Sequence, residues 1–213
     1  MAEKFTLPKA FTKEWFGYVW DYYKYHILVG LAVILVTVMT ISEIAGREKF
    51  DENINFVSSY VINTETAEKI EMLAEKGSED IDGNGEVNVF FSQLNFTEEA
   101  MKDPNTEIAL RNKLMSLFIT EEEFIYICDK KMMEEILSME RTEGLFMPAD
   151  KWSGIECEEG TFGVSLKDSA VFESAGVNSE ELYVLIRECY NTDNEKLVKK
   201  QENAINIAKF LIK

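Results

Sequence analysis

The residues best suited to chemistry stand in one acidic stretch, Asp80-Ile-Asp-Gly-Asn-Gly-Glu-Val-Asn88. Oxygen-bearing side chains recur there at alternate positions, the spacing by which a calcium loop brings several oxygens onto one hard cation. A glycine at position 85 permits the sharp turn that such a loop requires. The predicted ligands are the side chains of Asp80, Asp82 and Asn84 and the backbone carbonyl of Glu86. We therefore predict a bound Ca²⁺ in this stretch, with a structural rather than a catalytic role.

The stretch lacks two features of an EF-hand. Its twelfth position, where an EF-hand carries a bidentate glutamate, is Phe91. The residues that follow are typical of a strand, not of a helix. A calcium site here would need a further ligand from elsewhere, such as Glu79 or a distant acid. The alternative interpretation is a plain turn, because Asp, Asn and Gly all tolerate turn geometry.

Other catalytic patterns are missing or weakly defined. The sequence has no G-x-S-x-G, P-loop or G-x-G-x-x-G motif. Its single histidine, His26, precedes the whole C-terminal part, so a Ser-His-acid triad is excluded there. The acid runs 121–123 and 158–159 are expected to be solvated surface, and they would suit a glycosidase only if placed across a cleft. We therefore expect a protein that is not an enzyme, with a surface hydrolase as a minor alternative.

A continuous apolar run precedes these residues at 27–45, and residues 27–42 carry no charge. Its length is close to the roughly 20 residues that a helix needs to cross a bilayer. A surface-packed helix would show a polar face, which residues 27–36 lack. A cleaved signal peptide would show a short basic start and a small-x-small cleavage site, and neither is found here. Lys9, Lys13 and Lys24 precede the run, which favours a cytoplasmic N-terminus. We predict an uncleaved signal anchor of a single-pass cell-membrane protein whose C-terminal part is extracytoplasmic.

Aromatic residues crowd the segment before this span. Several apolar positions recur there at helical spacing, namely Phe11, Trp15, Val19 and Tyr22 or Tyr23. Aromatic rings with polar edges prefer the headgroup layer of a membrane. We expect residues 10–25 to form a short amphipathic helix at the cytoplasmic face, with His26 at its boundary. The alternative is a docking helix for a partner protein.

The formal net charge of −17 lies entirely beyond residue 46. Residues 47–213 hold 35 acidic and 18 basic side chains, whereas residues 1–46 are neutral overall. Such an acidic domain repels phosphate backbones, so nucleic acid is excluded as an expected partner. The same charge suits solubility and cation binding.

Three cysteines, Cys128, Cys157 and Cys189, are too few for a disulfide-stapled scaffold. Cys128 ends a strand-like run and is expected to be a small core residue. A bridge between Cys157 and Cys189 stays open at this point. The sequence has no CxxC motif or His/Cys cluster that would indicate zinc.

Strand patterns alternate with helix patterns after the apolar run. The predicted strands are 53–62, 86–94, 123–129, 161–166 and 181–188, and the predicted helices are 64–76, 104–118, 130–139 and 193–212. A loop at 144–152 carries Phe146 and Trp152, which we expect in the core rather than in a ligand site. Such alternation predicts an α/β domain with a mostly parallel sheet flanked by helices. The predicted organisation is an interfacial segment 1–26, a transmembrane helix 27–45, a linker 46–52 and one compact extracytoplasmic domain 53–213.

Two parts of the sequence resemble known families. The segment Trp20-Asp-Tyr-Tyr-Lys-Tyr-His-Ile27 resembles the start of single-span membrane proteins of Gram-positive, especially clostridial, bacteria. The order of Asp103-Pro-Asn, Glu123-Phe-Ile-Tyr-Ile-Cys-Asp129, Phe162-Gly-Val-Ser-Leu-Lys-Asp168 and the closing helix is similar to the extracellular solute-binding proteins of ABC importers. This resemblance implies a fold like one lobe of a periplasmic binding protein. The chain departs from that family by having room for only one lobe, or for a very reduced pair, and by lacking the lipid-carrying cysteine, and no binding residues transfer from it.

Together these features predict a membrane-anchored extracytoplasmic binding or interaction module with an unknown ligand. The alternative is an accessory or scaffold subunit of a membrane complex that binds no small molecule. The first function predicts a cleft with convergent polar groups, and the second predicts an exposed apolar patch. The expected partners are the lipid bilayer, through residues 27–45, and a small solute or a membrane protein.

Overall fold

The computed structural model describes residues 10–45 and 50–213. The chain divides into two compact units, residues 1–48 and residues 49–213. Most of the predicted linker, residues 46–49, and the first nine residues of the predicted interfacial segment lie outside the described residues.

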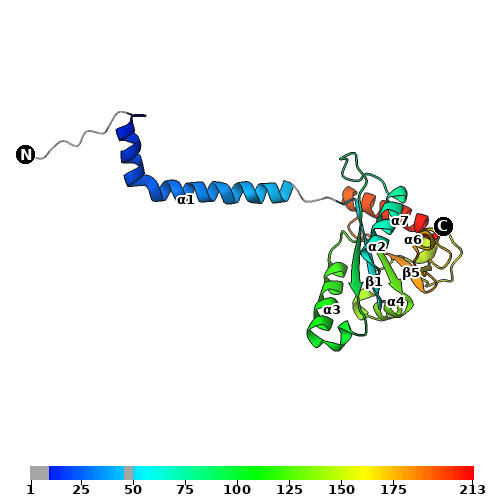
Figure 1. Ribbon diagram of the computed structural model, residues 1–213. Coiled ribbons are helices and arrows are strands. Elements are labelled where there is room, and N and C mark those ends of the chain that lie inside the picture. The colour runs from blue at the N-terminus through cyan, green and yellow to red at the C-terminus, as the bar shows by residue number, and fades with distance from the viewer. Residues whose placement is uncertain (1–9, 46–49) are drawn as a thin grey trace, which may run out of the picture. The chain divides into compact units, whose positions relative to one another are not determined.

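The first unit contains one helix, α1 (Lys13–Ala45). Its stretch Lys13–Ile41 is long and apolar enough to cross a membrane, and it contains an 18-residue window with a mean hydropathy of 2.0 and no buried residue. The hydroxyls of Thr37 and Thr40 donate to the carbonyls of Val33 and Val36, so these polar groups are satisfied within the helix. Figure 1 shows that α1 is bent, with a short first part and a longer second part. The predicted interfacial helix and span are thus two parts of one helix.

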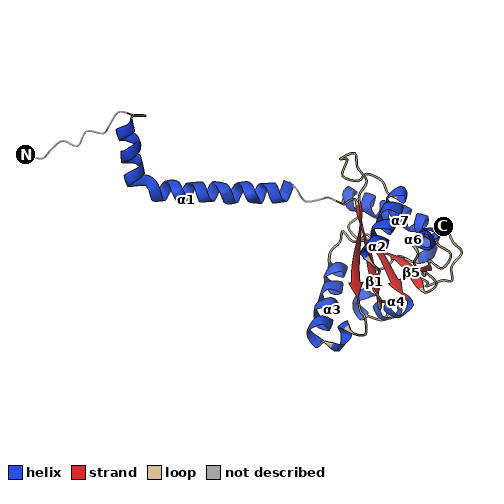
Figure 2. Cartoon of the chain, viewed as in Figure 1, coloured by secondary structure: helices blue, strands red, loops and turns tan. Residues whose placement is uncertain are grey.

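The second unit is built on a five-stranded sheet with the order β2-β1-β3-β5-β4 (Figure 2). The strands are β1 (Glu52–Ser58), β2 (Val89–Asn95), β3 (Ile125–Asp129), β4 (Val164–Ser165) and β5 (Leu182–Ile186). Strands β2, β1 and β3 are parallel, whereas β5 runs antiparallel to both β3 and β4. The sheet is therefore mixed, and the prediction of a mostly parallel sheet is correct only for its first three strands.

Helices connect and cover these strands. They are α2 (Thr64–Ala74), α3 (Pro104–Ile119), α4 (Lys130–Leu137), α5 (Ala149–Trp152), α6 (Ala170–Ala175) and α7 (Glu195–Ile212), with 3-10 turns at Glu75–Gly77, Ala100–Lys102 and Glu140–Thr142. The four predicted helices are confirmed with small differences at their ends. The short helices α5 and α6 were not predicted, because four and six residues are too few to show a helical period.

Polar side chains fix where the helices begin. The side chain of the N-cap residue accepts a backbone hydrogen bond at the start of α2, α3, α4, α6 and α7, the caps being Asn63, Asp103, Asp129, Ser169 and Asn194. Each such cap stabilises a helix by about 1 kcal/mol. Pro104 stands in the first turn of α3, as predicted from the Asp-Pro pair.

Two hydrophobic layers cover the two faces of the sheet, because successive strand side chains point to opposite faces. One layer packs Ile54, Phe56 and Ile127 against α2, α5, α6 and α7. The other packs Val57, Tyr126 and Cys128 against α3 and α4. Figure 1 shows α3 and α7 on opposite sides of the sheet. The helix after β1 therefore leaves to one face and the helix after β3 leaves to the other.

The expectations for buried side chains in this unit are confirmed. Phe146 and Trp152 are each 2% exposed and belong to the two core layers. Cys128 is fully buried at the end of β3. All three cysteines are free thiols, so the bridge between Cys157 and Cys189 is not formed.

Candidate functional site

The predicted calcium loop lies beside the amino end of β1. Carboxylate oxygens of Asp51, Asp80 and Asp82 come within 4.8 Å of one another there. This acidic triad offers three oxygen ligands of the kind that hard cations prefer. Asp51 directly precedes β1, and it is an acid from outside the loop of the kind that the predicted calcium site would need.

Hydrogen bonds from the loop backbone position Asp51, whose side chain is almost fully buried. Its Oδ1 accepts from the backbone N–H groups of Ile81 at 2.7 Å and Asp82 at 3.3 Å. Its Oδ2 accepts from the N–H of Asn88 at 2.9 Å, and its own N–H donates to the carbonyl of Asn88 at 2.8 Å. Asp51 therefore ties both ends of the loop to the start of β1.

Within the loop, Asp80 organises the turn. Its carboxylate accepts from the N–H groups of Gly83 at 2.6 Å and Gly85 at 2.8 Å. These bonds, the one from Gly85 first, lower the pKa of Asp80, so the carboxylate is ionised at neutral pH. Both glycines have positive φ angles, 73° and 88°, which non-glycine residues rarely adopt.

Two of the four predicted calcium ligands lie in the acidic triad, and the other two do not belong to it. Asp80 and Asp82 join the acidic triad. The side-chain oxygen of Asn84 accepts from the N–H of Glu86 at 2.7 Å. The ligand roles of Asn84 and Glu86 stay predictions. Glu79, named as a source of a further ligand, donates its N–H to Asn203.

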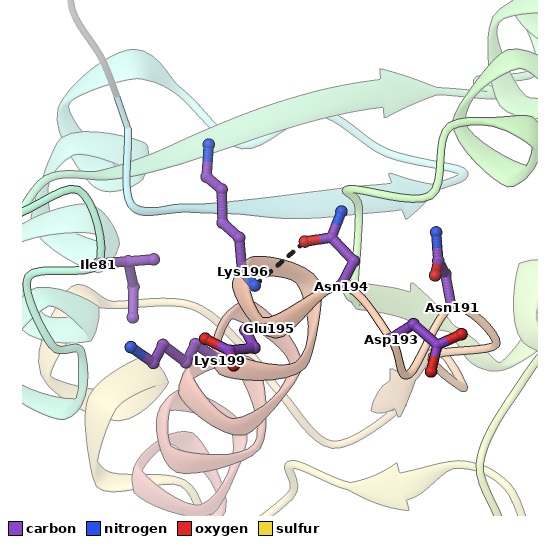
Figure 3. A pocket seen from close by; sticks show the side chains of 7 residues that line it. All are labelled: Ile81, Asn191, Asp193, Asn194, Glu195, Lys196 and Lys199. Carbon is purple, nitrogen blue, oxygen red and sulfur yellow. Dashed lines mark hydrogen bonds between the residues drawn. The ribbon is translucent and has the colours of Figure 1, made fainter.

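A cavity of about 620 Å³ adjoins the loop at Ile81 (Figure 3). Its other lining residues come from the start of α7 and the turn before it, namely Asn191, Asp193, Asn194, Glu195, Lys196 and Lys199. The side chain of Asn194 caps α7 by accepting from the N–H of Lys196 at 3.1 Å, which Figure 3 shows as a dashed line. The lining thus mixes charges of both signs on an exposed helix end.

A second cavity, of about 350 Å³, lies at the opposite end of the sheet, where β1 and β3 end. It is lined by Ser59 and Tyr60 after β1, by Asp129, Lys130 and Lys131 at the end of β3 and the start of α4, and by Asn178, Glu180 and Glu181 before β5. Because α2 and α4 leave to opposite faces, this is a topological switch point of the sheet. Open α/β sheets bind their ligands in the crevice at the carboxyl ends of strands at such a point.

Asp129 holds the two strand ends together beneath this cavity. Its Oδ2 accepts from the N–H of Ser59 at 2.5 Å and from the Ser59 hydroxyl at 2.6 Å. Its Oδ1 accepts from the N–H of Met132 at 2.8 Å and so caps α4. The side chain of Asp129 is buried, and these contacts make it a positioning residue for the cavity.

Tyr60 forms part of the cavity wall. Its ring packs edge-on against Phe56 with a centroid distance of 5.7 Å. Partial burial, and then the nearby charge of Asp129, raise the pKa of Tyr60 to about 12. Its hydroxyl is therefore protonated at neutral pH and can donate a hydrogen bond.

A smaller cavity of about 220 Å³ continues from the switch-point cavity and shares Tyr60 and Asn178 with it. Its remaining lining includes the apolar side chains of Val61, Ile62 and Val177. The carboxyl end of the sheet therefore offers a charged compartment beside one that is lined by uncharged side chains.

Glu123 departs from the expectation that its acid run is merely solvated. Its two carboxylate oxygens accept from the side-chain amides of Asn53 at 3.0 Å and Asn55 at 2.8 Å. The neighbouring acids of the run, Glu121 and Glu122, are exposed as expected. Glu123 thus joins the start of β3 to β1 at the amino end of the sheet.

Glu52 is a buried acid at the same end. It is fully buried, and its Oε2 has no hydrogen-bond partner among the described residues. Burial raises the pKa of Glu52 well above its usual range, and the charge of Lys200 opposes that shift without cancelling it. The amino end of the sheet therefore holds a buried carboxyl group with a raised pKa next to the acidic loop.

Sequence reasoning missed the switch-point cavity. Its residues lie in three segments, 59–60, 129–131 and 178–181, and none of them forms a motif alone. One signal was present, because the buried strand 123–129 ends on an aspartate that is followed directly by a helix. Without strand order, that signal indicates only a helix cap.

Comparison with known proteins gives no relative for this chain: no family model matches it, and no curated protein or solved structure is significantly similar to it.

Proposed function

We propose that the protein is a membrane-anchored extracytoplasmic module that binds a small polar ligand. The observation that carries this proposal is the cavity at the switch point between β1 and β3, where convergent polar side chains line about 350 Å³. That volume is in the range of small-molecule sites. The doubly wound order 2-1-3 of its three parallel strands supports the proposal, because open sheets of this kind bind ligands at the switch point.

Helix α1 supplies the anchor in this proposal. Its apolar second part spans the bilayer, and its bent first part lies in the cytoplasmic headgroup layer. Exposed aromatic side chains that precede the apolar run, such as Phe16, Trp20 and Tyr25, suit this layer, because Trp and Tyr combine an apolar ring with a polar edge.

Calcium has a structural role in the proposal. The ion binds to Asp51, Asp80 and Asp82 and fixes the loop to the start of β1, on the opposite end of the sheet from the cavity. Support comes from the lowered pKa of Asp80, which keeps this ligand ionised, and from the preference of Ca²⁺ for oxygen ligands.

Protease accessibility tests the anchor and its orientation. The full chain is expressed with a C-terminal epitope tag in bacterial cells, and protoplasts are treated with proteinase K. Loss of the tag in intact protoplasts, together with retention of the chain in the membrane after alkaline extraction, is expected. A tag that is protected until the protoplasts are lysed would contradict the proposed orientation.

Thermal unfolding tests binding. The full chain in detergent micelles is screened against separate sets of sugars, amino acids, short peptides and nucleotides. A ligand that binds the folded state raises the melting temperature by mass action. A rise with one set, abolished by the bulky substitution Asn178→Trp in the cavity wall, is expected. If no set raises the melting temperature, the binding function is wrong.

The second candidate function is an accessory subunit of a membrane complex. The observation that favours it is the set of exposed aromatic side chains between positions 11 and 25, where Phe11 is 82% and Tyr25 is 72% exposed. A photo-crosslinking amino acid at position 16 distinguishes the two functions. Crosslinks to lipid are expected under the first proposal, and a single stoichiometric protein adduct would favour the second.

A further inference from the structure

The geometry points to a small zwitterion, a free amino acid or a short peptide, as the ligand of the switch-point cavity. This inference rests on the proposed binding function and adds the chemical class of the ligand. In it, the ligand carboxylate lies against Lys130 and Lys131, and the ligand ammonium lies against Glu180 and Glu181. An apolar ligand side chain reaches the adjoining cavity at Val61 and Val177.

The cavity has walls of opposite charge in direct contact. Lys130 and Lys131 begin α4, and Glu180 and Glu181 precede β5. The N–H of Lys130 donates to the carbonyl of Glu181 at 3.0 Å, so the backbones that carry the two walls are joined. A zwitterion matches this arrangement because it presents both charges on a short frame.

These walls do not neutralise each other. The ion pairs in the described part of the chain join Lys69 to Glu65 and Arg111 to both Glu107 and Glu135. None of them uses the four charged side chains that belong to the cavity walls. Their ammonium and carboxylate groups therefore stay available to an incoming ligand.

The position of the two lysines is unfavourable for the fold alone. A helix N-terminus carries partial positive charge, so cations in the first turn are destabilising and acids are stabilising. Helices α2, α3, α6 and α7 follow this rule with Glu65, Glu107, Glu173 and Glu195 in their first turns. Helix α4 instead begins with two lysines, and its first turn adds no acid to the N-cap Asp129. A carboxylate bound at the cavity would offset this local repulsion.

Neutral polar groups complete the cavity. The protonated hydroxyl of Tyr60 can donate to a ligand oxygen. Asn178 uses its side-chain oxygen to accept from the N–H of Glu180 at 3.0 Å, which leaves its amide N–H groups to donate. The N–H and the hydroxyl of Ser59 donate to Asp129, so Ser59 supports the cavity wall and is not expected to bind the ligand.

Titration calorimetry with the full chain in detergent micelles tests the ligand class. The probes are leucine, the dipeptide Leu-Leu, N-acetyl-leucine, leucinamide and glucose. Leucine or Leu-Leu is expected to bind about tenfold or more tightly than the two analogues that each lack one charge. The tighter of the two zwitterions decides between a free amino acid and a peptide.

Paired variants test the assignment of the walls. The variant with Lys130→Gln and Lys131→Gln is expected to weaken zwitterion binding about tenfold or more while leaving leucinamide binding unchanged. The variant with Glu180→Gln and Glu181→Gln is expected to weaken zwitterion binding while leaving N-acetyl-leucine binding unchanged. The matched control, with Lys196→Gln and Lys199→Gln at the other end of the sheet, keeps wild-type affinity. Circular dichroism establishes that each variant is folded.

Two outcomes would overturn the inference. Binding of zwitterions and singly charged analogues with equal affinity would show that the charged walls do not select the ligand. Binding of glucose but of no amino acid or peptide would leave the binding function intact and remove this ligand class. A failure of every probe in calorimetry and in the wider thermal screen would instead contradict the binding function itself.

Discussion

The two ends of the sheet use the same kinds of residues to opposite effect. At the amino end, carboxylates are enclosed: Asp51 accepts three backbone N–H groups, and Glu123 accepts two side-chain amides. At the carboxyl end, Asp129 is enclosed in the same way, but the charges around it line an open cavity. The difference shows that charge density alone does not locate an open ligand cavity, because backbone N–H groups of the chain hydrogen-bond to Asp51 and Asp80 in the acidic loop.

Topology explains why a cavity forms between the carboxyl ends of β1 and β3. The loops after β1 and β3 diverge to opposite faces, so nothing from these connections fills the space between the strand ends. At the amino end, the loop 80–88 folds back onto the start of β1 and covers it through Asp51.

Removal of the Asp129 carboxylate is expected to have the largest effect. The substitution Asp129→Ala deletes the cap of α4 and both contacts to Ser59. We expect the free energy of unfolding to fall by about 3 kcal/mol, since hydrogen bonds to charged groups and helix caps each contribute about 1 to 3 kcal/mol. Urea unfolding followed by tryptophan fluorescence measures this loss. The exposed Asp168, changed to Ala, serves as the control and should cost little.

Calcium is expected to stabilise the amino end. At a free calcium concentration about 100-fold above the dissociation constant, binding to the folded state adds about 2.7 kcal/mol. For a chain of this size the melting temperature should then rise by about 5 to 10 °C. The substitution Asp51→Asn should abolish the rise, whereas Asp193→Asn should keep it. An unchanged melting temperature of the wild-type protein in millimolar calcium would contradict the calcium site.

The buried Glu52 is expected to make stability fall with rising pH. Burial raises its folded-state pKa above the ordinary value of 4.5, so above that pH the unfolded chain releases a proton that the folded protein keeps. Stability is therefore lost as pH rises from the unfolded-state pKa towards the folded-state pKa. The substitution Glu52→Gln should stabilise the protein by about 1 to 3 kcal/mol at pH 7.5 and by nothing at pH 4.

The matched control for this prediction is Glu79→Gln, because Glu79 is exposed at the same end of the sheet. It should leave the pH dependence of stability unchanged. A Glu52→Gln variant that is less stable than the wild type at pH 7.5 would contradict this prediction. It would mean that the ionised carboxylate makes a stabilising contact in the folded protein.

The smallest effect is expected from the two lysines at the start of α4. Replacing Lys130 and Lys131 by glutamine removes cations from the positive end of the helix, which should raise stability by about 0.5 to 1 kcal/mol without ligand. The same change should weaken zwitterion binding. A loss of stability instead would mean that the lysines support the fold rather than the ligand.

Local signals in the sequence predicted the elements well. The Asp103-Pro104 pair gave the start of α3, and the apolar run at 27–45 gave the second part of α1. Short elements without a period, such as α6, gave no signal. The direction of β5 was beyond local reasoning, because it depends on the pairing of Ile125 with Ile186, which are far apart in the chain.

The two candidate sites also differ in how far they could be predicted from local signals in the sequence. Asp80 and Asp82 were predicted from alternate spacing within one loop, but Asp51 joins them only through the fold. The cavity was not predicted at all, because it requires Ser59 and Asp129 to meet across neighbouring strand ends. Candidate ligands that stand in one contiguous motif could thus be predicted from the sequence, whereas a cavity that depends on the order of the strands could not.

Blocking the switch-point cavity tests the central claim most directly. Asn178 is exposed and lines both compartments, so the substitution Asn178→Trp should fill them without disturbing the core. Isothermal titration of the tighter-binding zwitterion, leucine or Leu-Leu, into this variant, with Asn191→Trp at the other end of the sheet as the control, gives the answer. We expect that Asn178→Trp abolishes zwitterion binding and that Asn191→Trp leaves the affinity unchanged. Undiminished binding to the Asn178→Trp variant would contradict the proposal that the ligand binds in the switch-point cavity.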